Sequence, residues 1–185
     1  MNAIVEQKPT SIYIPYALLV TALLSFYIVT LNKVDLRPGE VEYPAEAFLA
    51  PGFELPTLQG GKIKLSDYRG KVLFINFWAT WCGPCKIEMP SLESLYQKFK
   101  NKNFAMLAIS NDMFGETVVK PFVKAHKLSF PILLDQRLKA SNQFGVVSLP
   151  STFMIDPKGK IIGALYGAED WTTPSNILYF ENLLN

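Results

Sequence analysis

FWATWCGPC, at residues 77–85, is the stretch that decides the fold, because it holds both cysteines of the 185-residue chain. Cys82 and Cys85 stand three positions apart. Two thiols at this spacing can close a small disulfide ring and reopen it by exchange with another dithiol, through thiolate attack and a mixed disulfide. The stretch therefore predicts redox chemistry on sulfur.

Two structural interpretations of the cysteine pair compete with the redox one. A zinc site needs about four protein ligands, and His126 is the only histidine that could join the pair. A static disulfide across so short a loop adds little stability and does not require an exposed turn. Both explain the pair less well than dithiol exchange does.

The residues on either side of the pair predict a strand followed by a helix. Residues 72–78, VLFINFW, are largely apolar, β-branched or aromatic, which is typical of a strand buried on both faces. Pro84 suits the first turn of a helix, where its missing N–H costs little. Cys82 would then lie at or just before the helix N-terminus, where unpaired N–H groups and the helix dipole stabilise a thiolate. We expect Cys82 to attack and Cys85 to resolve the mixed disulfide.

The N-terminal part of the chain is more apolar than the rest. No charged side chain occurs between residues 9 and 32, and residues 12–31 as a helix would span about 30 Å, the thickness of a bilayer core. A cleaved signal peptide is one alternative, but it has a shorter apolar region and small residues at its cleavage site, whereas residues 26–31 are bulky. A buried core helix fits less well, because no polar face interrupts the run. We therefore predict an uncleaved signal anchor.

These features divide the chain into four parts. They are a short N-terminal tail (1–11), a transmembrane signal anchor (12–31), a linker (32–49) and one folded domain (50–185). The basic groups flanking the anchor are nearly balanced, so the positive-inside rule does not orient it, but the short tail favours a domain outside the cytoplasm. The net charge of +2 is uninformative, but the lack of a basic run in the sequence predicts no binding to nucleic acid.

Periodicity predicts an α/β domain in which strands and helices alternate. The predicted strands span residues 53–58, 62–65, 72–78, 104–110, 131–135, 146–156 and 161–166, and a Gly60-Gly61 turn joins the first two. The predicted helices span residues 84 to about 102, 117–126, 139–144 and 173–184, and Pro90 is expected to kink the first. This order predicts a mixed sheet covered by helices on both faces.

The run KVLFINFWATWCGPC (71–85), followed by Glu88-Met89-Pro90, resembles membrane-anchored thioredoxin-like proteins of the TlpA/ResA/CcmG type. Motifs at residues 50–53, 130–135 and 149–156 extend the resemblance over residues 50–185. The resemblance implies a thioredoxin fold with an N-terminal hairpin and a central insertion. It also implies that Cys82 is the exposed nucleophile and Cys85 the resolving thiol.

A substrate-binding surface beside the two thiols is a further implication of the resemblance. Pro150 is implied to be cis, to face the cysteine pair and to present backbone to a substrate, although an ordinary trans proline at a strand start is the alternative. The implied substrate-binding residues are Trp81, Gly83, Pro84, Leu149 and Pro150. Trp78 is expected in the core, and His126, in the inserted region, is assigned no role.

Two polar positions distinguish this chain from cytosolic thioredoxin. Asn76 stands where that protein has a buried aspartate, and an amide cannot accept the proton. Glu88 lies three residues after Cys85, on the same side of the helix, and matches the acidic residue that ResA-like proteins carry near their cysteines. A partly buried carboxylate with a raised pKa could move protons to and from Cys85, so Glu88 is a third catalytic candidate. A solvated helix carboxylate is the alternative.

The function implied is that of an enzyme, a protein-disulfide reductase held at a bacterial cell membrane with its catalytic domain outside the cytoplasm. Its clients would be proteins with cysteine pairs, apocytochrome c first, because haem attachment during cytochrome c biogenesis needs free thiols. Electrons would come from an integral-membrane dithiol donor of the CcdA/DsbD type, and no metal or cofactor beyond the Cys82–Cys85 disulfide is expected. The alternatives are a disulfide-forming oxidase or isomerase, and a non-catalytic binding module for cysteine-containing clients.

Overall fold

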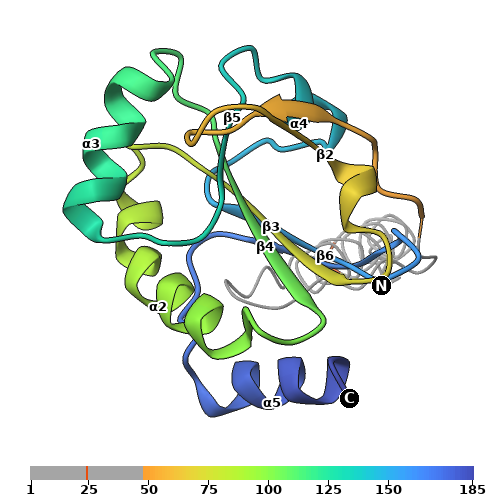
Figure 1. Cartoon of the computed structure of the whole chain (residues 1–185). Helices are drawn as coiled ribbons and strands as arrows, with labels where there is room; N and C mark the ends of the chain where they lie inside the picture. Colours follow the sequence, from red (N-terminus) through yellow and green to blue (C-terminus); the bar gives the residue numbers. More distant parts are fainter. Residues whose placement is uncertain (1–23, 25–47) are drawn as a thin grey trace, which may run out of the picture. The chain divides into compact units, whose positions relative to one another are not determined.

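The folded part of the chain is built around one sheet. A computed structural model describes Leu24 and residues 48–185, and in this part five strands follow the order β5-β4-β3-β6-β7 (Figure 1). These strands are β3 (Val72–Trp78), β4 (Phe104–Ser110), β5 (Ile132–Leu134), β6 (Ser151–Ile155) and β7 (Ile161–Tyr166). The helices are α2 (Gly83–Phe99), α3 (Glu116–His126), α4 (Lys139–Gln143) and α5 (Pro174–Leu183), with a short 3-10 helix, η1, at Leu65–Tyr68. A separate hairpin pairs β1 (Glu54–Pro56) with β2 (Lys62–Lys64).

The sheet is mixed, as predicted. β3 runs parallel to β4, with Val72 opposite Phe104 and Trp78 opposite Ser110, and antiparallel to β6. Every residue of β3 and of β4 is buried, which confirms the prediction of strands covered on both faces. Alternate side chains of these strands enter opposite cores, because strand side chains point in turn to the two faces of a sheet.

Helices cover both faces of the sheet, also as predicted. One core joins Phe74 and Trp78 of β3 to α2, α3 and α5 through side chains such as Leu92, Val119 and Phe180. The opposite face is covered by α4 together with β1 and η1. The crossovers β3-α2-β4 and β4-α3-β5 move in the same direction across the sheet, so right-handed connections place α2 and α3 on one face. This layered arrangement is the thioredoxin-like fold that the resemblance implies.

The longest predicted strand is much shorter in the structure. Residues 146–156 are rich in β-branched side chains, but β6 includes only Ser151–Ile155. The strand prediction is wrong for residues 146–150, because Gly145 turns the chain with a φ of 68° and these residues pair with neither β3 nor β7. The Leu149–Pro150 peptide bond is cis. The cis bond confirms one implication of the resemblance, the cis form of Pro150. The segment 146–150 is therefore a loop at the end of the sheet where β3 meets α2.

The predicted tail (1–11) and signal anchor (12–31) lie outside the described residues apart from Leu24, and of the predicted linker only Phe48 and Leu49 are described. Within the described part of the chain, no helix combines the length and the apolar character needed to cross a membrane. Phe48 already contacts the folded domain, since its carbonyl accepts a hydrogen bond of 2.9 Å from the Ile161 N–H.

Candidate active site

The two cysteines lie at the junction between β3 and α2. Cys82 is the N-cap residue of α2, and a disulfide joins it to Cys85 with the two Cα atoms 5.3 Å apart. The Cys85 N–H donates to the Cys82 sulfur at 3.2 Å. Pro84 occupies the first turn of the helix. These positions confirm the predicted strand-to-helix junction, and they put the Cys82 sulfur where a negative charge is stabilised by helix N–H groups and the helix dipole.

Cys82 is less exposed than the resemblance implies. Its exposed fraction is 5%, and that of Cys85 is 0%. The prediction of an exposed nucleophile is therefore wrong for the disulfide form. Cys82 is reached through a cleft of about 430 Å³, here called the dithiol cleft. The residues that line it are Trp81, Cys82, Gly83, Pro84, Asn111, Leu138, Val146, Val147, Ser148 and Leu149.

The dithiol cleft contains four of the five predicted substrate-binding residues, Trp81, Gly83, Pro84 and Leu149. Pro150, the fifth, is buried and is not among the residues that line the cleft, and its carbonyl accepts a hydrogen bond of 2.9 Å from the Gly167 N–H. Of the two residues joined by the cis bond, only Leu149 lines the cleft.

The rim of the dithiol cleft is strongly apolar. Trp81 is 69% exposed and Val147 is 90% exposed, and Leu138 beside them is 41% exposed. Such an apolar rim suits a peptide segment with hydrophobic side chains next to its cysteines. Trp78, by contrast, is fully buried, which confirms its predicted place in the core.

Glu88 is buried on α2, one helical turn after Cys85. Only 1% of this residue is exposed, so the alternative of a solvated helix carboxylate is wrong. Side chains three apart on a helix have Cβ atoms about 5–6 Å from each other. The carboxylate accepts a hydrogen bond of 2.9 Å from the Asn76 Nδ2 and a longer one of 3.4 Å from the Glu169 N–H.

The surroundings of Glu88 raise its pKa. Burial is the largest cause, and it outweighs the opposing hydrogen bonds from Asn76 and the Glu169 backbone and the nearby Trp171 indole N–H, so that the pKa of Glu88 rises to about 7. The Trp171 Nε1 is itself buried with no hydrogen-bond partner of standard geometry in the described part of the chain. A carboxyl group with this pKa can both accept and give up a proton near neutral pH.

Asn76 and Glu88, predicted as two separate features, form one buried unit. The Asn76 Nδ2 donates to Glu88 at 2.9 Å and to the Thr152 hydroxyl of β6 at 3.0 Å. Its Oδ1 is buried and has no hydrogen-bond partner among the described residues. The Asn76 amide thus holds the Glu88 carboxylate in place.

Asp112 is a positioning residue that the sequence reasoning missed. It is 3% exposed, and its carboxylate accepts hydrogen bonds from the Thr80 N–H at 2.9 Å and the Thr80 hydroxyl at 2.6 Å. The Ser110 hydroxyl donates to it as well, at 2.8 Å. These bonds tie the loop just before Cys82 to the end of β4. The available signal was an aspartate two residues after a buried strand, since neighbouring parallel strands end at the same edge of a sheet.

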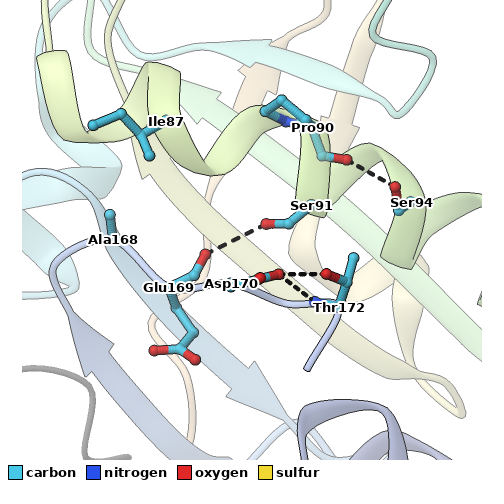
Figure 2. Close-up of a pocket in the computed structure, with 8 residues that line it drawn as sticks. All are labelled: Ile87, Pro90, Ser91, Ser94, Ala168, Glu169, Asp170 and Thr172. Atoms are coloured by element: carbon cyan, nitrogen blue, oxygen red, sulfur yellow. Dashed lines mark hydrogen bonds between the residues drawn. The ribbon is translucent and has the colours of Figure 1, made fainter. Parts of the chain in front are cut away.

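A second hollow lies on the outer side of α2, near Glu88. Figure 2 shows this groove of about 460 Å³, lined by Ile87, Pro90, Ser91, Ser94, Ala168, Glu169, Asp170 and Thr172. The Ser91 hydroxyl donates to the Glu88 carbonyl at 2.8 Å and to the Glu169 carbonyl at 3.3 Å. In Figure 2 the Glu169 carboxylate points away from α2, so this residue faces Glu88 with its backbone. Solvent therefore reaches two residues that contact Glu88.

His126 lies away from both hollows. It is exposed at the end of α3, where its Nδ1 is 2.9 Å from the Phe122 carbonyl and its ring stacks on Phe122 at 3.9 Å between centroids. Among the described residues, no group of His, Cys, Asp and Glu side chains is arranged to hold a metal ion.

The chain is similar to known thiol-disulfide oxidoreductases over this region. It matches the AhpC/TSA family over residues 49–164. It is 42% identical over 120 residues to the thiol-disulfide oxidoreductase ResA of Bacillus thuringiensis subsp. konkukian, with 65% of this chain and 69% of the relative covered. ResA of Bacillus subtilis is 37% identical over 137 residues, with 73% of each chain covered. A solved structure from Chlorobium tepidum, provisionally assigned as thiol:disulfide interchange protein DsbE, has a TM-score of 0.70 at 27% identity, covering 79% of this chain and 100% of that one.

Proposed function

The chain belongs to the AhpC/TSA family and is a thiol-disulfide oxidoreductase, and from this premise we propose that it reduces disulfides of client proteins outside the cytoplasm. The observation that carries the proposal is the arrangement of a disulfide at a helix N-terminus with a buried carboxyl group of pKa about 7 one turn further along the helix. The first group supplies the nucleophile, and the second supplies a proton acceptor for the thiol that resolves the intermediate.

The reaction begins with the reduced enzyme. The Cys82 thiolate, stabilised at the start of α2, attacks one sulfur of a client disulfide. The client S–S bond breaks, its other sulfur leaves as a thiolate and takes up a proton, and Cys82 is joined to the client in a mixed disulfide. The apolar rim formed by Trp81 and Val147 would hold the client segment during this step.

The second step releases the client. The Cys85 thiol passes its proton to Glu88 and attacks the Cys82 sulfur, so that the mixed disulfide breaks and the second client sulfur leaves as a thiolate and is protonated. The client has then gained two electrons and two protons, and the enzyme is left with the Cys82–Cys85 disulfide. A membrane dithiol donor of the CcdA/DsbD type would return the electrons.

The role of Glu88 can be tested by replacing it with the neutral isostere. Glu88→Gln should change both thiol pKa values of the reduced enzyme and slow the release of the mixed disulfide, because Cys85 loses its proton acceptor. Glu116→Gln, an exposed carboxylate of α3, is the control and should leave both unchanged. Unchanged thiol pKa values in Glu88→Gln would remove Glu88 from the mechanism.

We propose a single-pass membrane anchor at residues 12–31 and a catalytic domain on the outer side of a bacterial membrane. The apolar length of that segment supports this, and a tether raises the effective concentration of the domain toward membrane partners. Apocytochrome c is the first client we propose, on the resemblance to ResA-like proteins. A mixed disulfide between a Cys85→Ser variant and an apocytochrome c peptide with the CxxCH segment would test the client. No mixed disulfide with any protein would favour the binding-module alternative.

The direction of electron flow is set by the redox potential of the Cys82/Cys85 couple. Reductases such as thioredoxin lie near about −270 mV, whereas the strong oxidant DsbA lies near about −120 mV. We expect a value close to the former, measured by equilibration with glutathione or dithiothreitol. A value near the latter would overturn the reductase proposal in favour of a disulfide-forming oxidase or isomerase.

A further inference from the structure

The end of the domain opposite the dithiol cleft is rich in exposed basic side chains. Here it is called the basic pole, and its members are Arg69, Lys71, Lys98, Lys100, Lys102, Lys158 and Lys160, all of them exposed. It surrounds the start of β3, while Cys82 follows the end of the same strand. Because β3 has seven residues and a strand rises about 3.3 Å per residue, the two ends lie roughly 20 Å apart.

Hydrogen bonds join the segments of the basic pole into one surface. The Gly70 N–H donates to the Pro157 carbonyl at 2.8 Å, and the Arg69 guanidinium donates to the Lys158 carbonyl. On the other side, the Asn103 side chain donates to the Gly70 carbonyl at 2.8 Å. The turn between β6 and β7, the start of β3 and the end of α2 are thereby held side by side.

The charge of the folded domain is concentrated at this pole. Residues 48–185 carry 15 Lys and Arg and 11 Asp and Glu, a net charge of +4. The pole holds seven of the basic residues and three acidic ones, Asp67, Asp156 and Glu181. The other eight basic and eight acidic residues balance, so the pole accounts for the whole net charge of the domain.

The described chain enters the domain at the basic pole. The Ala50 N–H donates to the Gly159 carbonyl, and Leu49 pairs with Lys160 in an isolated bridge. Figure 1 shows the start of the domain, in orange, beside the blue turn that joins β6 to β7. Phe48 and Leu49 are 56% and 63% exposed, which places two large apolar side chains next to the lysines.

We propose that the basic pole, with Phe48 and Leu49, docks on a bilayer surface that carries anionic lipid. Lysine and arginine attract phosphate headgroups, and apolar side chains beside them enter the boundary between headgroups and acyl chains. This inference rests on the proposed membrane anchor, which would keep the domain within reach of the bilayer. Docking points the dithiol cleft away from the membrane, toward a client in the aqueous phase.

The partner is a lipid surface rather than a soluble polyanion for two reasons found at the pole itself. A purely electrostatic site has no use for the exposed apolar pair Phe48 and Leu49. The sequence that contains the uncharged stretch 12–31 is also joined to the domain at Phe48. Each lysine near an anionic surface is worth roughly a fivefold change in membrane partition. Lys98 is paired with Glu181 at 3.1 Å, so the attraction comes from the net excess of four basic charges at the pole, acting once the domain is held near the bilayer.

The test uses the full chain in nanodiscs of phosphatidylcholine, with or without phosphatidylglycerol. Amine labelling read by mass spectrometry should show Lys71, Lys100 and Lys160 protected only in the anionic discs, and high salt should remove the protection. Lys124 and Lys139, which lie outside the pole, should label equally in both discs. Equal labelling of the pole lysines in the two kinds of disc would overturn the proposal.

Two charge-reversal variants distinguish the effect of the basic pole's position from the effect of the protein's net charge. K71E/K158E should lose the protection of Lys100 and Lys160, whereas K124E/K139E, with the same change in net charge, should keep it. Equal loss in both variants, or protection by soluble heparin and not by anionic discs, would also overturn the proposal. The proposed anchor is tested separately by whether the chain inserts into discs of pure phosphatidylcholine. If the chain inserts into neither kind of disc, the anchor proposal is wrong. Binding of the basic pole to anionic lipid is then tested by whether the protein sediments with phosphatidylglycerol vesicles.

Discussion

Replacing Glu88 with glutamine should alter the dependence of stability on pH in a direction set by the buried carboxyl group. Its pKa rises from 4.5 in an unfolded chain to about 7 in the folded one, chiefly because of burial. Between these two values the folded protein binds a proton that the unfolded chain does not. The free energy of unfolding of the wild type therefore falls as pH rises through this window, and it levels off above about pH 7.

The magnitude follows from the same pKa values. A rise from 4.5 to about 7 corresponds to about 3 kcal/mol, at about 1.4 kcal/mol per pKa unit. Glutamine keeps an oxygen for the Asn76 amide, but its NH₂ group then faces the Glu169 N–H, and one lost hydrogen bond costs about 1 kcal/mol. Glu88→Gln should thus be about 1 kcal/mol less stable than the wild type near pH 4 and about 2 kcal/mol more stable near pH 8.

Urea denaturation of the oxidised protein at several pH values measures this crossover. Glu93→Gln, on the same helix, is the matched control, and its effect on the pH dependence of stability should have the opposite sign. Burial alone would raise the pKa of Glu93, but hydrogen bonds from Ser129 and Gln97 outweigh it and lower the pKa. Glu93→Gln should therefore lose stability relative to the wild type as pH rises above the acidic range. A difference between Glu88→Gln and the wild type that does not vary with pH would refute the reasoning.

Three further substitutions test neighbouring parts of the structure. Asn76→Asp removes the amide donor and adds a second buried carboxyl group, so it should raise the pKa of Glu88 above about 7 and move the rate profile for reduction of a small disulfide to higher pH. Asp112→Ala leaves the Thr80 N–H and hydroxyl without their acceptor and should cost about 2–4 kcal/mol in urea denaturation, with slower thiol exchange. Phe180→Ala opens a cavity where α5 meets the sheet and should cost about 3–5 kcal/mol in thermal denaturation with little effect on the redox potential.

The centre of the fold could be predicted because its sequence pattern is strong and local. The apolar runs of β3 and β4 are buried from end to end, and a cysteine before Gly-Pro fits a helix N-terminus. Residues 146–150 were predicted wrongly for the opposite reason. Val146 and Val147 favour extended structure by themselves, yet a strand also needs a partner, and here the chain leaves the sheet so that Val147 is 90% exposed. Pattern alone does not show which extended residues find a partner.

Contacts between distant segments account for the parts of the site that could not be predicted. Asp112 and Thr80 are 32 positions apart and meet only because β3 and β4 are neighbours in the sheet. Glu169 reaches Glu88 from 81 positions away, through the segment that joins β7 to α5. The loop before β6 likewise lines the cleft beside Cys82, although more than 60 positions separate them. Spacing along one helix was enough to relate Glu88 to Cys85, but not to show how deeply either is buried.

Asn76 explains how one buried site can serve both protonation states of Glu88. An ionised carboxylate needs a donor, and the Asn76 Nδ2 supplies it at 2.9 Å. A protonated carboxyl group needs an acceptor, and the Asn76 Oδ1 is buried with no partner in the described residues. Rotation of the amide by half a turn exchanges the two groups, and Thr152, whose hydroxyl both donates and accepts, can pair with either one. An aspartate at this position would offer acceptors only when ionised, so an amide fits a carboxyl group that titrates near neutral pH.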